Sequence, residues 1–277
     1  MEFKNTVVNN FEGAFRGLRN PLNSWRKSDS AFGISTVDCD MDYKIAAEYN
    51  DVNEQYDFEK EYDKYSENLE QYALWLRENG ILKYSVNNGC FEYVFLGPRD
   101  LDLAQRMIKA GPSDSKFLRQ IEVCVDITAP LYWWKEFDTY KVGTVANSTS
   151  TMHKLASTSI TLSNFERDDY NRSLIISEEE NADGETFNIF VDDMVKELID
   201  YLEKIRLKYL ETGDKKYWKE LIRWLPNGWL QTRTVTLNYA VLRNQYFQRR
   251  YHKLSEWHQY CDWIKTLPYA SELIIYE

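Results

Sequence analysis

PNGWLQTRTVTLNYAVLRNQYFQR, residues 226–249, is the stretch of sequence that decides the fold. It is predicted to form one long amphipathic helix, with amides and a guanidinium where a surface helix usually carries Glu and Lys. At about 100° per residue, one face carries Asn238, Leu242, Gln245 and Arg249, and Asn244 lies about 120° round from Asn238. Amides donate and accept hydrogen bonds without charge, and Arg offers a planar fork of donors, which together suit a heterocycle or a phosphate. A solvated helix face is the alternative that the segment leaves open.

Two upstream segments add to this pattern. Residues 121–127, IEVCVDI, alternate at period two as a half-buried strand does, and ITAPLYWWKEF, residues 127–137, leads into a helix with Thr128 as its predicted N-cap. GTVANSTST, residues 143–151, follows. It is either a linker with capping hydroxyls or a loop whose hydroxyls, amide and backbone N–H groups hold a ligand.

In this order and spacing, the segments resemble the flavin-dependent thymidylate synthases. The run from LP through T-x-N to Arg249 resembles the family's C-terminal ligand helix, and NSTS resembles the N-E-x-S part of its signature. The resemblance implies that Asn147, Asn238 and Asn244 contact FAD, that Arg249 holds the uracil of dUMP, and that Ser150 contacts the nucleotide. The resemblance also implies catalytic roles for Arg249 and Ser150. Lys141 is a further candidate for the flavin, and Lys135 and Arg223 are further candidates for the substrate.

The sequence departs from the family where the signature begins. The family's Arg-His-Arg falls on Thr139, Tyr140 and Lys141, and the Glu of N-E-x-S is Ser148. Two alternatives to a synthase therefore stay open. One is an enzyme that makes a different pyrimidine modification, and the other is a nucleotide-binding relative without synthase activity.

The resemblance also implies an architecture and a set of partners. The fold would be α+β, with long helices packed on a small antiparallel sheet, in a single domain over residues 1–277 with an insertion at about 38–97. The implied reaction is reductive methylation of dUMP to dTMP, with methylenetetrahydrofolate as carbon donor and NADPH as reductant. The flavin carries the hydride in such chemistry, so no cysteine nucleophile is required. The family's shared active sites imply a homotetramer.

Composition excludes several other classes of protein. A net charge of −10 over 277 residues argues against binding a nucleic-acid polymer through its backbone. The four cysteines are scattered and the three histidines lack metal-ligand spacing, so we expect no metal site. We expect no signal peptide and no membrane span, and a cytoplasmic location.

Further elements are predicted from local patterns. Residues 2–16 suggest an edge strand, residues 81–97 a β-hairpin with Asn88-Gly89 as its turn, residues 101–110 a helix, and residues 59–79 a helix in an acidic, Tyr-rich region. Residues 164–184 suggest a loop, and residues 187–210, 218–224 and 254–263 suggest helices. RNPLNSW, residues 19–25, is either a structural loop or a loop that contacts a ligand.

Overall fold

The computed structural model describes residues 1–35, 83–87, 90–150 and 155–277. Most of the predicted insertion, including the expected helix at 59–79, lies outside the described residues. The chain divides into two compact units. Unit 1 comprises Met1–Lys4, Asp126–Lys141 and Ala146–Val235, and unit 2 comprises Asn5–Val125, Val142–Val145 and Thr236–Glu277. The single-domain assignment stays a prediction.

The strands among the described residues form three small sheets. The largest has the order β1 (Glu2–Asn9), β5 (Glu122–Pro130), β9 (Leu230–Asn238) and β6 (Val145–Ser148). A second sheet places β4 (Cys90–Phe95) between β2 (Ala31–Ser35) and β3 (Lys83–Asn87), with both pairings antiparallel. The third is an antiparallel hairpin of β7 (Ile175–Glu180) and β8 (Thr186–Phe190). The predicted α+β class is confirmed.

Unit 2 is built from helices whose apolar residues recur at helical spacing. It contains α1 (Phe11–Arg19), α5 (Pro98–Ala110), α10 (Tyr239–Arg249), α11 (Ser255–Lys265), the 3₁₀ turn η3 (Lys116–Arg119) and a C-terminal π-helical turn η6 (Ala270–Ile274). On α1 the buried positions are 11, 14, 15 and 18, and on α11 they include 257, 260, 261 and 264. Aromatic rings join these elements, with Phe11 edge-on to Tyr239 at 5.6 Å between ring centroids.

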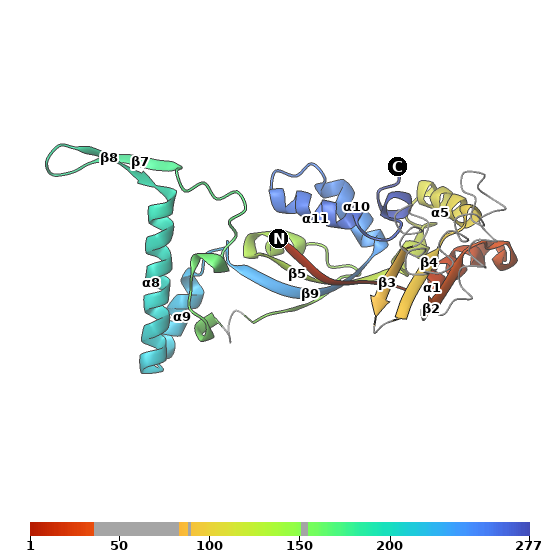
Figure 1. The fold of residues 1–277 in the computed structure, drawn as a ribbon, viewed down its shortest axis with the longest axis horizontal. Helices are drawn as coiled ribbons and strands as arrows, with labels where there is room; N and C mark the ends of the chain where they lie inside the picture. Colours follow the sequence, from red (N-terminus) through yellow and green to blue (C-terminus); the bar gives the residue numbers. More distant parts are fainter. Residues whose placement is uncertain (36–82, 88–89, 151–154) are drawn as a thin grey trace, which may run out of the picture. The chain divides into compact units, whose positions relative to one another are not determined.

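Unit 1 holds the 22-residue helix α8 (Val191–Thr212), which packs against α9 (Lys215–Trp224), as Figure 1 shows. Gly213 ends α8 in the left-handed conformation, and the Asp214 side chain caps α9 by accepting from Lys216 N. A buried cluster of Leu155, Ile160, Phe165, Leu202 and Leu221 forms the core between them. Arg206 of α8 holds both Glu203 and the carbonyl of Ala156, and this ion pair lowers the pKa of Glu203. The 3₁₀ turns η4 (Leu155–Ser157) and η5 (Leu162–Asn164) and the helix α6 (Leu131–Phe137) complete the unit.

The prediction of a continuous helix over residues 226–249 is wrong. Residues 230–238 form the strand β9, and only residues 239–249 are helical. The strand carries β-branched residues in alternation, and Gln231, Val235 and Leu237 are buried while Thr234 and Thr236 are exposed. This period-two pattern decides against the helix, because buried alternate positions fit a pleated sheet.

Smaller differences concern where individual elements begin and end. Residues 2–9 form an edge strand as predicted, but residues 11–16 belong to α1. Thr128 lies inside β5 rather than at a helix cap, and its hydroxyl pairs with that of Thr232 at 2.7 Å. Part of the loop predicted at 164–184 is the strand β7, and residues 187–190 are the strand β8 instead of the start of a helix. The hairpin near 81–97 is confirmed for β3 and β4, while its turn at 88–89 lies outside the described residues.

A buried carboxylate ties α5 to the segment after α1. Asp100 is fully buried, and its Oδ1 accepts from Arg19 Nε at 2.5 Å. Its Oδ2 accepts from the hydroxyls of Ser28 and Ser30, both at 2.6 Å, and from Ser30 N. A buried ion pair becomes tolerable when its remaining polar sites are hydrogen-bonded, and Asp100 meets that condition. This arrangement fixes where residues 19–30 lie against α5.

None of the helices in the described part of the chain is both long enough and apolar enough to cross a membrane.

Candidate functional site

The first turn of α10 places Asn238 at its N-cap. The Asn238 Oδ1 accepts from Val241 N at 3.1 Å, so the amide carbonyl satisfies one of the open N–H groups of the helix. Gly143 lies directly opposite, with φ of 74°, and a Cβ added there would come within 2.9 Å of Asn238 Nδ2. Asn238, which is predicted to contact the flavin, therefore caps α10. Its Nδ2 lies close to Gly143, where the backbone conformation favours glycine.

We expect Asn238→Ala to lower the free energy of unfolding by about 1 kcal/mol, because alanine cannot accept the Val241 N–H. Asn238→Ser keeps an oxygen at this position and should retain most of the stability. Urea unfolding of the three proteins measures the difference. Equal stability of the alanine and serine variants would show that the cap contributes nothing.

Asn244 lies in the middle of α10, and Arg249 is its last residue. Asn244 is exposed, and its Oδ1 accepts from Gln248 Nε2 at 2.8 Å. Arg249 is half-buried, and its guanidinium carbon lies 4.8 Å from the ring centroid of Trp257, within the range of a cation–π contact. Trp257 is fully buried, so the ring against which the guanidinium packs is held in place by the core. Five residues separate the two side chains, which places them about 140° apart around the helix axis.

Other polar side chains of α10 and its C-cap residue form hydrogen bonds or ion pairs within the fold. Gln245 is fully buried, and its Oε1 accepts from the Tyr260 hydroxyl at 2.6 Å. Arg243 donates to the carbonyls of Ile274 and Tyr276, and Arg250 forms an ion pair with Glu277. Gln245, which was expected to share a polar face with Asn238 and Arg249, thus belongs to the core.

Asn147 and Ser150 lie in and just after the short strand β6. Asn147 is exposed and Ser150 is half-buried. Between them, Thr149 N donates to Thr232 O at 2.9 Å, and Thr149 O accepts from Gln231 Nε2 at 3.0 Å. These bonds hold the backbone beside Ser150 against β9 within unit 1, which favours an ordered segment over a linker.

Of the three further candidates for ligand binding, Lys135 and Arg223 contact neighbouring side chains. Lys135 Nζ donates to Asn227 Oδ1 at 2.6 Å, and Arg223 pairs with Glu220 one turn earlier on α9 at 2.5 Å. Lys141 is exposed in the segment that falls on the family's Arg-His-Arg. In the same segment, the Thr139 hydroxyl donates to Glu136 O. The roles proposed for Lys135, Lys141 and Arg223 stay predictions.

Arg233 on β9 is not among the residues that the sequence predicts for the site. Its Nη1 donates to Asp138 Oδ1 at 2.7 Å, its Nε donates to Gln231 Oε1 at 2.9 Å, and its guanidinium carbon lies 4.2 Å from the ring centroid of Trp134. Recognising the alternation in QTRTVTL as a strand would have drawn attention to this side chain, because it places Arg233 on the same strand face as Gln231.

The thiols of Cys124 and Cys261 do not resemble nucleophiles. Cys261 is buried, and burial raises the pKa of its thiol to about 11, so it is protonated at neutral pH. Cys124 lies half-buried on β5. Among the described residues, no three His, Cys, Asp or Glu side chains gather where they could hold a metal ion.

Comparison with known proteins places the fold. A crystal structure of thymidylate synthase X from Helicobacter pylori with FAD and dUMP aligns with 99% of this chain and 97% of that chain, with a TM-score of 0.53 and 14% identity. A second structure, of the flavin-dependent thymidylate synthase from the same organism complexed with FAD and dUMP, covers 64% of this chain and 83% of that chain at 16% identity and a TM-score of 0.45.

A UMP/dUMP methylase from Streptomyces cacaoi, bound with 5-Br UMP, covers 65% of this chain and 82% of that chain at 14% identity and a TM-score of 0.45. No family model and no curated protein matches the sequence. The full-length alignment nevertheless gives a clear structural result: the chain has a fold like that of the flavin-dependent thymidylate synthases.

Proposed function

We propose that the protein binds a pyrimidine nucleotide, dUMP or a close relative, together with FAD, and that it modifies the pyrimidine. The observation that carries the proposal is the guanidinium of Arg249, which Trp257 supports at the end of α10 in a fold shared with a protein crystallised with FAD and dUMP. A planar guanidinium can donate two parallel hydrogen bonds to carbonyl or phosphate oxygens. Arg249 would orient the pyrimidine and stabilise charge that develops on its ring.

The residues proposed for the flavin fit such a group in part. The amides of Asn147 and Asn244 are exposed, and amides suit the mixed donors and acceptors along the edge of an isoalloxazine ring. FAD would supply hydride transfer when bound. Ser150 would donate its hydroxyl to the nucleotide. Methylenetetrahydrofolate, NADPH and a homotetrameric assembly belong to the same proposal.

A second candidate function is nucleotide binding without synthase activity. Residues 139–141 favour it, because Thr139 and Tyr140 bring no positive charge where the family has Arg-His-Arg, and Lys141 brings one. Lys141 lacks the planar fork that makes arginine suited to phosphate and flavin oxygens. This candidate retains the role of Arg249 and drops the reductive step.

Titration with FAD and dUMP separates the two candidates. If the protein is a synthase, FAD should bind with micromolar affinity, as seen by quenching of flavin fluorescence. Tritium should then be released from dUMP labelled at carbon five when methylenetetrahydrofolate and NADPH are added. Calorimetric binding of dUMP without any flavin binding would favour the second candidate. Absence of both binding events would overturn the proposal as a whole.

A further inference from the structure

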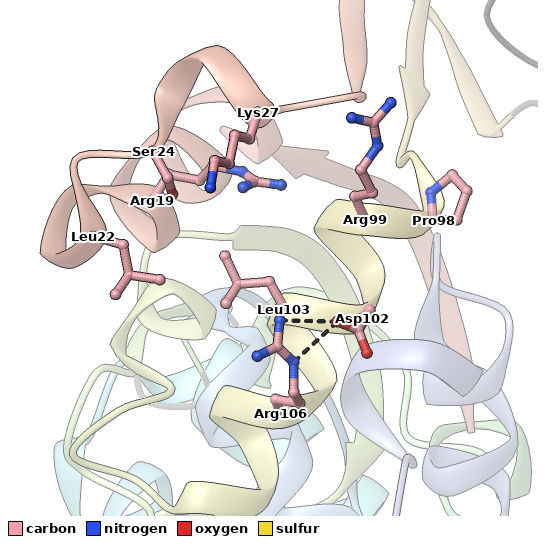
Figure 2. A pocket seen from close by; sticks show the side chains of 9 residues that line it. All are labelled: Arg19, Leu22, Ser24, Lys27, Pro98, Arg99, Asp102, Leu103 and Arg106. Atoms are coloured by element: carbon pink, nitrogen blue, oxygen red, sulfur yellow. Dashed lines mark hydrogen bonds and ion pairs between the residues drawn. The ribbon is translucent and has the colours of Figure 1, made fainter. Parts of the chain in front are cut away.

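A cavity of about 630 Å³ lies within unit 2, between α5 and the segment that follows α1. One wall comes from residues 19–27, which include the 3₁₀ turns η1 (Asn20–Leu22) and η2 (Trp25–Lys27), and the other from residues 98–106 of α5. Figure 2 shows the side chains from both walls around this space. Its volume falls within the range of pockets that bind small molecules, about 300–1,000 Å³.

Two buried polar atoms in the cavity wall have no hydrogen-bond partner among the described residues. They are Nη2 of Arg19 and Oγ of Ser24. Arg19 is only 5% exposed, and Asp100 holds its Nε at 2.5 Å, so the guanidinium is fixed while Nη2 is left over. A buried donor without an acceptor costs about 1–3 kcal/mol. Such a cost is offset when a ligand supplies the acceptor.

The Asp100 carboxylate does not compete for these donors. Its second oxygen already accepts from Ser28 and Ser30. The first backbone N–H groups of α5 are also engaged, because Arg99 N and Asp100 N both donate to the side chain of Asp29. The side chains of Arg19 and Ser24, rather than the helix terminus, are therefore the donors that this site offers.

Four cations line the cavity, namely Arg19, Lys27, Arg99 and Arg106, although the chain carries a net charge of −10. Three of them form ion pairs: Arg19 with Asp100, Arg99 with Asp29 at 3.4 Å, and Arg106 with Asp102 at 2.9 Å. The exposed Lys27 adds a positive charge beside these pairs. Leu22, Pro98 and Leu103 supply an apolar surface beside the charges. A ligand that fits this wall has an anionic group and an apolar or aromatic part.

We propose that this cavity is a binding site for a phosphate monoester of a small molecule. Arg19 Nη2 and the Ser24 hydroxyl donate to phosphate oxygens, and the positively charged Lys27 adds a third donor at the rim. A phosphate monoester has three terminal oxygens that can accept from all three donors, and its charge of about −1.5 to −2 at neutral pH exceeds that of a carboxylate. Leu22 and Leu103 contact the apolar part of the ligand. The site shares no residue with α10 and stands independently of the function proposed there.

Calorimetric titration with phenyl phosphate, inorganic phosphate and phenol tests this site on the full chain. Phenyl phosphate should bind more tightly than inorganic phosphate, and phenol should not bind measurably. Ser24→Ala should weaken phenyl phosphate about tenfold, because it removes a hydrogen bond to a charged group. Lys27→Ala should weaken it about two- to fivefold, since this cation is exposed.

Arg26→Ala is the matched control, because it removes one positive charge from the neighbouring residue of η2, which does not line the cavity. It should change the affinity by less than about a factor of two at physiological ionic strength. Arg249→Ala should leave phenyl phosphate binding unchanged, which keeps this result separate from the fate of the α10 proposal. Equal losses in Lys27→Ala and Arg26→Ala, an unchanged affinity in Ser24→Ala, or phenol binding as tightly as phenyl phosphate would each overturn the site.

Discussion

Replacing Asp100 with alanine is expected to lower the free energy of unfolding by about 3–5 kcal/mol. The substitution removes the carboxylate that neutralises Arg19, whose side chain is 6% exposed, and leaves a buried guanidinium without its counter-charge. It also removes the acceptor for Ser28 and Ser30, so the segment between α1 and β2 loses part of its attachment to α5 and keeps the bonds to Asp29. Unfolding in urea, followed by circular dichroism, measures the loss.

Asp102→Ala is the matched control for this prediction. Asp102 lies on the same helix and pairs with Arg106, but both side chains are more than half exposed. Removing an exposed pair of this kind changes stability by about 0–1 kcal/mol. If the two aspartate variants lost the same stability, burial of the Arg19–Asp100 pair would not be the reason for the effect.

The second large effect is expected at Arg249. A charge-assisted contact from its guanidinium to a ligand oxygen contributes about 1.5–3 kcal/mol, so Arg249→Ala should weaken dUMP binding on the order of tenfold to a hundredfold. Arg249→Lys should not restore the affinity, because an ammonium lacks the planar fork and stacks less well on Trp257. Calorimetric titration of dUMP, with melting temperatures measured alongside, follows both variants.

Arg250→Ala provides the comparison for Arg249. Arg250 is the next residue, and it forms an ion pair with Glu277 at 2.6 Å. Its removal should leave dUMP affinity unchanged and cost at most about 1 kcal/mol of stability. An Arg249→Ala protein that binds dUMP as tightly as the unchanged chain would remove this residue from the site and leave the pyrimidine assignment without its main support.

The sequence predicted the elements that local pattern determines. The alternation at 121–127 predicted β5, and the helices predicted at 101–110, 187–210, 218–224 and 254–263 correspond to α5, α8, α9 and α11. Prediction from the sequence was wrong where the pattern is compatible with both helical and strand periodicity. Residues 230–238 carry polar side chains that fit either a helix face or a strand, and pairing within the four-stranded sheet decides for the strand.

The candidate site was predictable only at the level of single residues. The sequence placed Asn244 and Arg249 on one helix, but it did not reveal that Asn238 caps that helix or that Trp257 lies beneath Arg249. The loop at 19–25 is predicted to be either structural or in contact with a ligand, but the partner of Arg19 could not be inferred, because Asp100 lies 81 residues away in the chain. Contacts of this kind depend on packing between distant segments, which leaves no periodic signal.

The Arg19–Asp100 pair also has an evolutionary consequence. Loss of either partner alone leaves a buried charge without its counter-charge. Replacing both with apolar residues of similar volume often leaves stability unchanged or raises it. Substitutions at these two positions should therefore be inherited together, and intermediates that carry only one of them should be purged. Ser28 and Ser30, which serve only the carboxylate and the neighbouring backbone, would be released to drift once the pair is gone.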